Sequence, residues 1–374
     1  MTEPEAVDFL VVGAGMAGAS AAYFLAAEAR VALIERESQP GYHTTGRSAA
    51  MFSEIYGNAQ IRGLSRGGRR FFVGPPAGFA EAPLLTPRGA LFFGRADQMA
   101  ALDALLAEIA EPARLRPIDG ARCREYVPVL RPDYVAGGAF EADAMDIDVA
   151  ALHQGFLRGL KARGGSVVTD AELLGLAAEP GVWRAETRAG AFRAQVVINA
   201  AGAWCDAVAE LAGVRPVGLT PKRRTAIVFQ PGTDCTAWPL AVDCQEEFYF
   251  KPEAGRLLGS PADETPMPPC DVQPEELDIA ICADRIQTAT TLTISRIERS
   301  WAGLRSFVAD KTPVAGFDAD RPGFFWLAGQ GGYGIQTAPG LGRTAAALAQ
   351  GRPVPGELQD LGVSAAELSP RRLR

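Results

Sequence analysis

The first forty residues place apolar runs around a glycine-rich turn, in the order of a parallel β-α-β unit. The run at 8–12 predicts a buried strand, residues 16–29 an alanine-rich helix, and residues 30–35 a second buried strand. Crossovers between parallel strands are right-handed, so we expect these two strands to pair in parallel. The uncharged stretch at 9–27 is long enough for a membrane span, but glycines interrupt it and acidic residues precede it. We therefore expect no transmembrane or targeting segment.

The rest of the chain contains strands of two kinds. Continuous apolar runs, typical of buried parallel strands, recur at 166–169, 195–200 and 324–328. Between them, strand pairs or single strands are predicted at 84–95, 183–194, 224–229, 247–251, 288–295 and 300–308. Helical spacing predicts helices at 96–110, 148–163 and 334–349. This pattern predicts an α/β fold combined with an α+β fold, as two domains interleaved in sequence.

Composition and net charge argue against several classes of function. The chain has 374 residues and a formal net charge of -7, which argues against a nucleic-acid partner. Only two histidines are present, and none of the six cysteines forms a CxxC pair, so we expect no metal site and no disulfide framework. Reduced thiols are typical of a cytoplasmic protein, which is the location we expect.

The turn after the first strand carries the chemistry of a dinucleotide site. Gly13-Ala14-Gly15-Met16-Ala17-Gly18 fits the pattern GxGxxG between a strand and a helix. Its glycines allow a tight turn, close approach of a pyrophosphate and close helix packing, and the helix N-terminus attracts phosphate. Glu35 ends the second strand, where a carboxylate accepts hydrogen bonds from a ribose hydroxyl. Because of this carboxylate, the neighbouring Arg36 does not indicate a 2′-phosphate.

Three further segments are rich in small residues. Arg47-Ser48-Ala49-Ala50 places a serine where it can cap a helix or hold a phosphate. Residues 199–204 end a strand in Ala201, Gly202 and Trp204, so a flavin or its ribityl chain can lie against the backbone. Residues 329–337 form a glycine-rich nest before the last helix, suited to the anionic edge of a reduced flavin. The candidate cofactor residues in this nest are Gly331, Gly332, Tyr333, Gly334, Ile335 and Gln336.

Taken together, these elements resemble the D-amino-acid oxidase superfamily of FAD enzymes, and within it the bacterial FAD-dependent D-arginine dehydrogenases. The resemblance spans essentially the whole chain and is carried by residues 40–50, 151–159, 199–206, 221–224, 301–310, 330–337 and 369–373. It implies a Rossmann-like FAD-binding domain and an antiparallel-sheet substrate domain that roofs the flavin. We assign residues 1–50, 143–215 and 310–374 to the first domain and 51–142 and 216–309 to the second. No cysteine stands where relatives attach FAD covalently, so we expect noncovalent FAD.

The resemblance also implies a set of substrate residues. Arg224 and Arg305 match the arginines that bind the substrate carboxylate, and a guanidinium pairs with a carboxylate through two parallel hydrogen bonds. The other matching positions near the substrate or the flavin are Tyr56, Tyr249, Gly332, Gln336 and Ser53. A buried phenol needs a polar partner, although core packing is the alternative for both tyrosines.

Two departures from the D-arginine enzymes concern the pocket. Ala90 stands where those enzymes have a glutamate that grips the guanidinium, and Met51 replaces a histidine near the flavin. Both changes make the pocket more apolar, so we expect a small or hydrophobic D-amino acid instead of D-arginine. Glu54 is a nearby carboxylate whose direction the sequence leaves open.

The predicted reaction is hydride transfer from the substrate Cα to the flavin N5, followed by hydrolysis of the imino acid to a keto acid. The electron acceptor, whether a quinone, a carrier or oxygen, is not determined by the sequence. One alternative is an oxidase of sarcosine-like or cyclic secondary amines, and another is a non-catalytic FAD-binding sensor. A nicotinamide-dependent flavoenzyme is disfavoured, because the glycines at 329–334 are assigned to the flavin and no further GxGxxG is left for a nicotinamide nucleotide.

Overall fold

A sheet built around the N-terminal strand forms one half of the molecule in the computed structural model, which describes residues 4–111 and 113–374. At its centre β1 (Glu5–Val12) pairs in parallel with β2 (Val31–Ile34) and with β12 (Gly190–Asn199). The parallel part continues through β9 (Ser166–Val168) and β20 (Phe324–Ala328). Antiparallel strands complete the sheet: β10 (Leu173–Glu179), β11 (Val182–Thr187) and β19 (Val314–Phe317). The predicted β-α-β unit and the hairpin within 183–194 are therefore confirmed.

Helices cover this sheet because their small residues allow close packing. On one face lie α1 (Met16–Leu25), α5 (Val149–Ala162) and α8 (Ala338–Ala349), which share one apolar core with the strands. A Cβ on Gly342 of α8 would lie 2.8 Å from the Ser20 side chain of α1, so this contact requires glycine. The opposite face packs against α6 (Cys205–Leu211). The chain also contains α2 (Ala59–Val73), α9 (Gly356–Gln359) and α10 (Ala365–Leu368).

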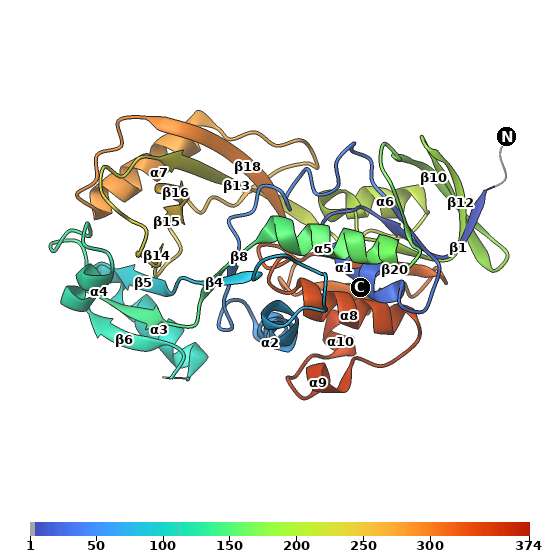
Figure 1. The fold of residues 1–374 in the computed structure, drawn as a ribbon, viewed down its shortest axis with the longest axis horizontal. Helices are drawn as coiled ribbons and strands as arrows, with labels where there is room; N and C mark the ends of the chain where they lie inside the picture. Colours follow the sequence, from blue (N-terminus) through green and yellow to red (C-terminus); the bar gives the residue numbers. More distant parts are fainter. Residues whose placement is uncertain (1–3, 112) are drawn as a thin grey trace.

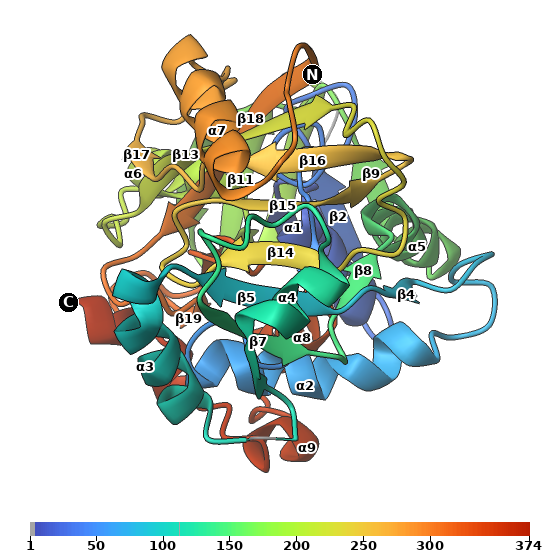
Figure 2. The same cartoon turned by 90° about the vertical axis from the view of Figure 1, so that its left-hand side faces the viewer.

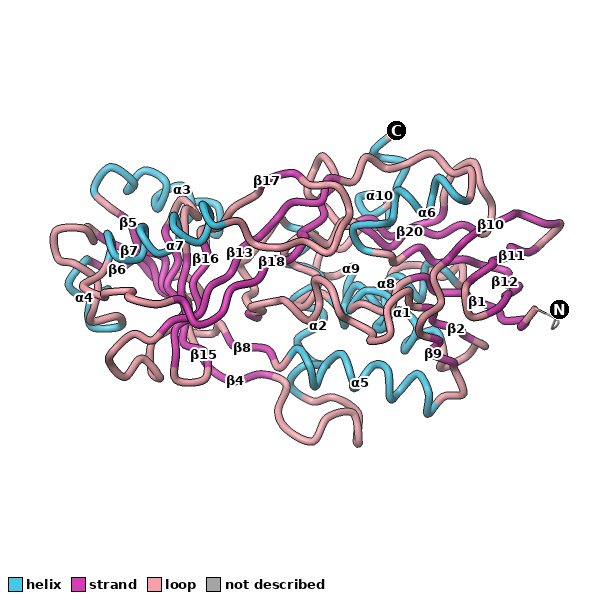
Figure 3. Tube along the Cα trace, turned by 90° about the horizontal axis from the view of Figure 1, so that it is seen from above, coloured by secondary structure: helices cyan, strands magenta, loops and turns pink. Residues whose placement is uncertain are grey.

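A second sheet, antiparallel except for one parallel pair of strands, lies beside the first, and we call it the roof (Figure 1). Its strands follow the order β17-β13-β16-β15-β14-β5-β7-β6, with β18 also on β13. Their bounds are β5 (Ala90–Gly94), β6 (Arg116–Asp119), β7 (Gly137–Glu141), β13 (Thr220–Phe229), β14 (Leu240–Asp243), β15 (Tyr249–Glu253), β16 (Arg256–Ser260), β17 (Thr265–Pro266) and β18 (Ile297–Phe307). Seen from above, these strands gather at one end of the molecule, and β13 and β18 extend toward the first sheet (Figure 3).

The outer face of the roof is apolar and covered by helices. Figure 2 views this face, with α4 (Gly120–Tyr126) and α7 (Glu276–Ala289) in front of the strands, whereas α3 (Met99–Ile109) packs through Leu102 and Ile109 against Ala139 on the other face. Leu91, Phe93 and Phe250 pack here against Cys123 of α4 and Ile286 of α7. Side chains alternate between the faces of a strand, so the residues between them point to the inner face, toward the first sheet.

A three-stranded sheet joins the two halves. Its pairing and the end of α7 show that three predictions were wrong. It contains β3 (Met51–Phe52), β4 (Leu85–Pro87) and β8 (Met145–Ile147). Residues 84–95 are therefore not a hairpin, because β4 pairs with β8 whereas β5 enters the roof. Ser48 begins no helix but leads into β3, and residues 288–295 form no strand, because α7 extends to Ala289. Within the described ranges, no helix has the length and apolar character needed to cross a membrane.

Candidate flavin and substrate site

The glycine turn has the backbone geometry that its sequence predicts. Gly13 adopts φ +99°, and a Cβ on it would lie 2.6 Å from the Ala200 carbonyl oxygen. A Cβ on Gly18 would lie 1.9 Å from the Gly13 carbonyl oxygen, so Gly18 lets α1 pack against the turn. Gly15 is the N-cap of α1, and the first turn of α1 contains no acidic residue. The positive end of the helix is therefore open to an anionic group.

Glu35 is fixed at the end of β2 by backbone donors. Its Oε2 accepts a hydrogen bond from the Ala14 N–H at 2.9 Å, and its Oε1 accepts one from the Glu37 N–H at 3.1 Å. The side chain still lines the cavity described below, and a carboxylate oxygen can accept more than one hydrogen bond. This is the arrangement expected of a carboxylate that binds a ribose hydroxyl.

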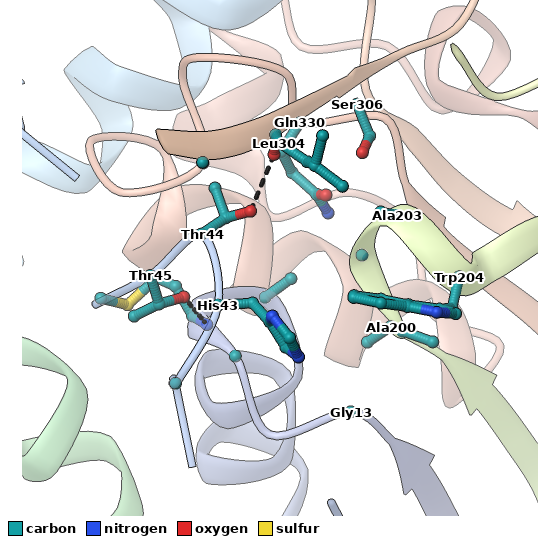
Figure 4. Close-up of a pocket in the computed structure, with 18 of the residues that line it drawn as sticks. Gly13, His43, Thr44, Thr45, Ala200, Ala203, Trp204, Leu304, Ser306 and Gln330 are labelled. Carbon is teal, nitrogen blue, oxygen red and sulfur yellow. Dashed lines mark hydrogen bonds between the residues drawn. The ribbon is translucent and has the colours of Figure 1, made fainter. Parts of the chain in front are cut away.

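One cavity of about 350 Å³ extends from the glycine turn to the roof (Figure 4). The predicted residues that line it are Gly13, Gly15, Met16, Ala17, Glu35, Arg36, Arg47, Ser48, Ala49, Ala201, Gly202, Trp204, Arg224, Tyr249, Arg305, Gly331, Gly332, Gly334 and Ile335. Ala14, Gly18, Ala50, Tyr333 and Gln336 do not line it; the first two instead support the turn. The long shape, the glycine cradle and the carboxylate at one end fit a dinucleotide such as FAD.

Several residues of the cavity wall were not predicted. Thr45 Oγ1 accepts a hydrogen bond from the Met16 N–H at 3.0 Å, and Thr44 Oγ1 donates one to the Leu304 carbonyl at 2.7 Å (Figure 4). His43 packs against the ring of Trp204 at 4.7 Å between centroids. The threonine pair between Gly41 and Gly46 was a signal that the sequence analysis could have used. The contact of His43 with Trp204 depends on segments that are distant in sequence.

Two arginines of the roof reach the cavity, and they differ in whether a carboxylate lies beside the guanidinium. Arg305 of β18 is partly buried and lines the cavity, and within the described part of the chain no carboxylate oxygen lies within 4.0 Å of it. Arg224 of β13 also reaches the cavity, but its Nε donates to the Asp263 carbonyl at 2.9 Å and its Nη2 lies 3.4 Å from Glu264 Oε1. Arg305 is therefore the better placed of the two for an external carboxylate.

Two tyrosines and a glycine surround Arg305. Tyr249 lines the cavity, and the ring of Tyr56 packs against Tyr333 at 4.7 Å between centroids. Burial raises the pKa of Tyr56 and the Arg305 charge only partly opposes this, so the phenol stays protonated and able to donate. A Cβ on Gly332 would lie 2.8 Å from Arg305 Nη1, so a side chain at this position would displace the guanidinium.

The remaining predicted residues lie in the wall behind the cavity. The Ser53 N–H donates to Gln336 Oε1 at 3.2 Å, and Gln336 Nε2 donates to Ser65 Oγ at 3.0 Å, so the amide of Gln336 is already engaged. Met51 of β3 pairs with Asp146 of β8 and does not line the cavity. Ala90 is buried and pairs with Glu141 of β7, a carboxylate that sequence reasoning missed.

Glu54, whose direction the sequence left open, and two lysines of the roof have definite partners. Glu54 is held by Arg69 and Arg114, so it does not replace the carboxylate missing at position 90. Lys251 is buried and bonded to Asp146 at 2.6 Å. Lys222 lies 2.8 Å from Glu264.

Comparison with known proteins shows the same combination of elements elsewhere. A family model described as FAD dependent oxidoreductase (DAO) matches residues 8–348. The glycine oxidase of Bacillus licheniformis is 24% identical, with 93% of this chain and 94% of that protein covered. Human mitochondrial sarcosine dehydrogenase is 25% identical over 62% of this chain and 27% of its own length.

Solved structures agree in fold. The L-proline dehydrogenase from P. horikoshii superposes with a TM-score of 0.84 at 21% identity, covering 99% of this chain and 98% of that one. The glycine oxidase from Geobacillus kaustophilus gives a TM-score of 0.81 at 19% identity, covering 96% and 99%. The particular resemblance to D-arginine dehydrogenases stays a prediction. The family match over most of the chain, together with a cavity that fits the dinucleotide, establishes that this chain belongs to the DAO family of FAD-dependent oxidoreductases.

Proposed function

We propose that this enzyme oxidises the C–N bond of a small amino acid that has a free carboxylate, and that its substrate is a D-amino acid. The observation that supports this is Arg305, a partly buried guanidinium at the cavity with no carboxylate within 4.0 Å among the described residues. A charge removed from water is stable only when it is paired or well hydrogen-bonded. A substrate carboxylate provides that partner through two parallel hydrogen bonds.

The other residues of the site would orient the substrate. Tyr56 and Tyr249 present phenols around Arg305, and Gly332 keeps the space beside the guanidinium clear. Glu35, the glycine turn and the N-terminus of α1 would hold FAD at the opposite end of the cavity. Bound FAD supplies the acceptor for the two electrons and the hydrogen that leave the substrate carbon. The protein contributes proximity and orientation, and Arg305 is its principal anchor.

A second candidate is oxidation of a secondary amine such as sarcosine or a cyclic imino acid. Two of the relatives named above support it, since their names include the secondary amines sarcosine and proline. Both candidates use the same carboxylate anchor, so Arg305 does not distinguish them. They differ in whether the substrate nitrogen carries a second carbon.

The deciding experiment is anaerobic mixing of the purified FAD-bound protein with single amines while the flavin absorbance is followed. The panel contains D-Leu, D-Met, D-Phe, D-Arg, glycine, sarcosine and L-Pro. Fastest bleaching by a D-amino acid supports the first candidate, and bleaching only by sarcosine or L-Pro supports the second. Absence of bleaching with every amine would contradict both and favour a binding protein.

The carboxylate anchor is tested by Arg305→Met. Hydrogen bonds to a charged group are worth about 1.5–3 kcal/mol, so we expect KM to rise about 10- to 150-fold for the best amine. Arg299→Met is the matched control, because Arg299 lies on the same strand and is exposed. An unchanged KM in Arg305→Met would refute this role.

A further inference from the structure

Glu141 is a buried carboxylate on the inner face of the roof. It ends β7 and is 2% exposed. Its neighbour Phe140 stacks on Tyr126 of α4 at the outer face, so Glu141 points inward. In the register of the sheet it lies opposite Ala90, the position from which the sequence predicted an apolar pocket.

The carboxylate has a single side-chain donor. Ser53 Oγ lies 2.8 Å from Oε2 and 3.1 Å from Oε1, and one hydroxyl can donate to only one oxygen at a time. In the part of the chain that the structure describes, no cationic nitrogen lies within 4.0 Å of Glu141. The charged groups that act on it are Asp143 and Glu54, and both are acidic. Lys251, buried to a similar extent in the roof, has a carboxylate partner.

Without a cation, Glu141 holds a proton more readily than an exposed glutamate. Burial raises its pKa to about 7, while the hydrogen bonds from the Ser53 side chain and the Glu54 backbone lower it only in part. The proton matters for the direction of the shared hydrogen bond. A charged Glu141 must accept from Ser53, whereas a neutral one can donate to Ser53 Oγ and release the serine proton.

Ser53 connects this carboxylate to the substrate end of the site. Its N–H donates to Gln336, which directly follows the glycine-rich segment 329–335. Within that segment Gly332 lies against Arg305. Three residues after Ser53 the chain reaches Tyr56, whose ring packs against Tyr333 of the same segment. One chain of contacts, buried at Glu141, Ser53 and Gln336, therefore joins the roof to both sides of the carboxylate anchor.

We propose that Glu141 is a positioning residue for the amine-oxidising site. Its proton sets the direction of the hydrogen bond to Ser53, and Ser53 holds the Gln336 amide and the Tyr56 segment in place beside Arg305. Substrate binding and turnover then respond to a group that touches neither substrate nor flavin. The inference rests on the proposed function for its effect on turnover, but its structural part does not.

The experiment compares the wild type with Glu141→Gln and Ser53→Ala, and uses Asp143→Asn as control. Asp143 lies two residues away and is exposed, so its loss removes the same charge without the buried hydrogen bond. Amide hydrogen exchange of the FAD-free protein is measured at pH 5.5 and pH 8 for residues 51–57 and 330–337. Rates are expressed as protection factors, relative to the intrinsic exchange rate at each pH, which removes the intrinsic pH dependence of exchange.

We expect the protection factors of these segments in the wild type to differ about tenfold between the two pH values. This is the size expected for one hydrogen bond to a charged group. The change should disappear in Glu141→Gln and Ser53→Ala and persist in Asp143→Asn. The same pH dependence in Glu141→Gln as in the wild type would overturn the inference.

Flavin reduction by the fastest amine of the panel is then followed from pH 5.5 to pH 9. An inflection near pH 7 in the wild type that is absent from Glu141→Gln supports the role in turnover, and an inflection retained by Glu141→Gln contradicts it. If no amine reduces the wild type, the proposed function fails, while hydrogen exchange still decides whether Glu141 positions the two segments.

Discussion

Replacing Glu141 by glutamine should change how the stability of the protein depends on pH. Glutamine keeps the shape of the side chain and an acceptor for Ser53 but has no titrating proton. The pKa of Glu141 is raised from 4.5 to about 7 because the side chain is buried. At about 1.4 kcal/mol per pKa unit, this difference corresponds to about 3 kcal/mol.

The sign follows from proton binding. Between pH 4.5 and pH 7 the folded state binds more protons at Glu141 than the unfolded state, so the free energy of unfolding falls as pH rises. Below this window the side chain is neutral in both states, and above it the full penalty of a buried charge is present. Between pH 5 and pH 8 the wild type should lose about 2–3 kcal/mol relative to Glu141→Gln.

The assay is chemical denaturation of the FAD-free wild type and Glu141→Gln at pH 5 and pH 8. The difference between the two proteins isolates Glu141, because other buried acids such as Asp243 and Asp263 are common to both. Asp143→Asn should retain the pH dependence of the wild type with its midpoint at somewhat lower pH, since the Asp143 carboxylate is exposed and raises the pKa of Glu141 only through its charge. Parallel pH curves for wild type and Glu141→Gln would refute the assignment of a raised pKa to this residue.

Three further substitutions test the cavity. Gly13→Ala places a Cβ 2.6 Å from the Ala200 oxygen at φ +99°; strain of about 1–3 kcal/mol should weaken FAD binding about 5- to 150-fold, measured by flavin fluorescence titration of the FAD-free protein. Glu35→Ala removes the ribose acceptor and should raise the Kd for FAD about tenfold or more by the same titration, whereas unchanged affinity would exclude that role. Gly332→Ala should displace Arg305 and raise KM for the best amine about tenfold while FAD binding is retained; equal KM values would show that the guanidinium is not displaced.

The residues of the cofactor end were largely predictable from sequence. Gly13, Gly18 and Glu35 act within a single β-α-β unit, so their spacing along the chain fixes their arrangement in space. The same holds for the strand at 195–200, which pairs with β1 as a parallel neighbour. Ser48 shows the limit of local reasoning, because a plausible helix cap proved to be extended chain before β3.

The substrate end depended on contacts between distant segments. Arg224 and Arg305 were equivalent in sequence, but only the fold gives Glu264 to the first and leaves the second without a carboxylate among the described residues. Gln336 was predicted near the substrate or the flavin, and only the fold shows that Ser53 and Ser65 bind its amide.

The sequence by itself determined the cofactor-binding unit, its glycine geometry and the family of FAD enzymes, because these depend on short-range spacing and on backbone sterics. Tertiary structure alone decided which arginine is available and where the roof carries charge. Ala90 predicted an apolar wall, yet Glu141 enters at the same register position from a strand about fifty residues away. Strand pairing and burial set the partners of such side chains, and neither is specified by the residues adjacent to them in the chain.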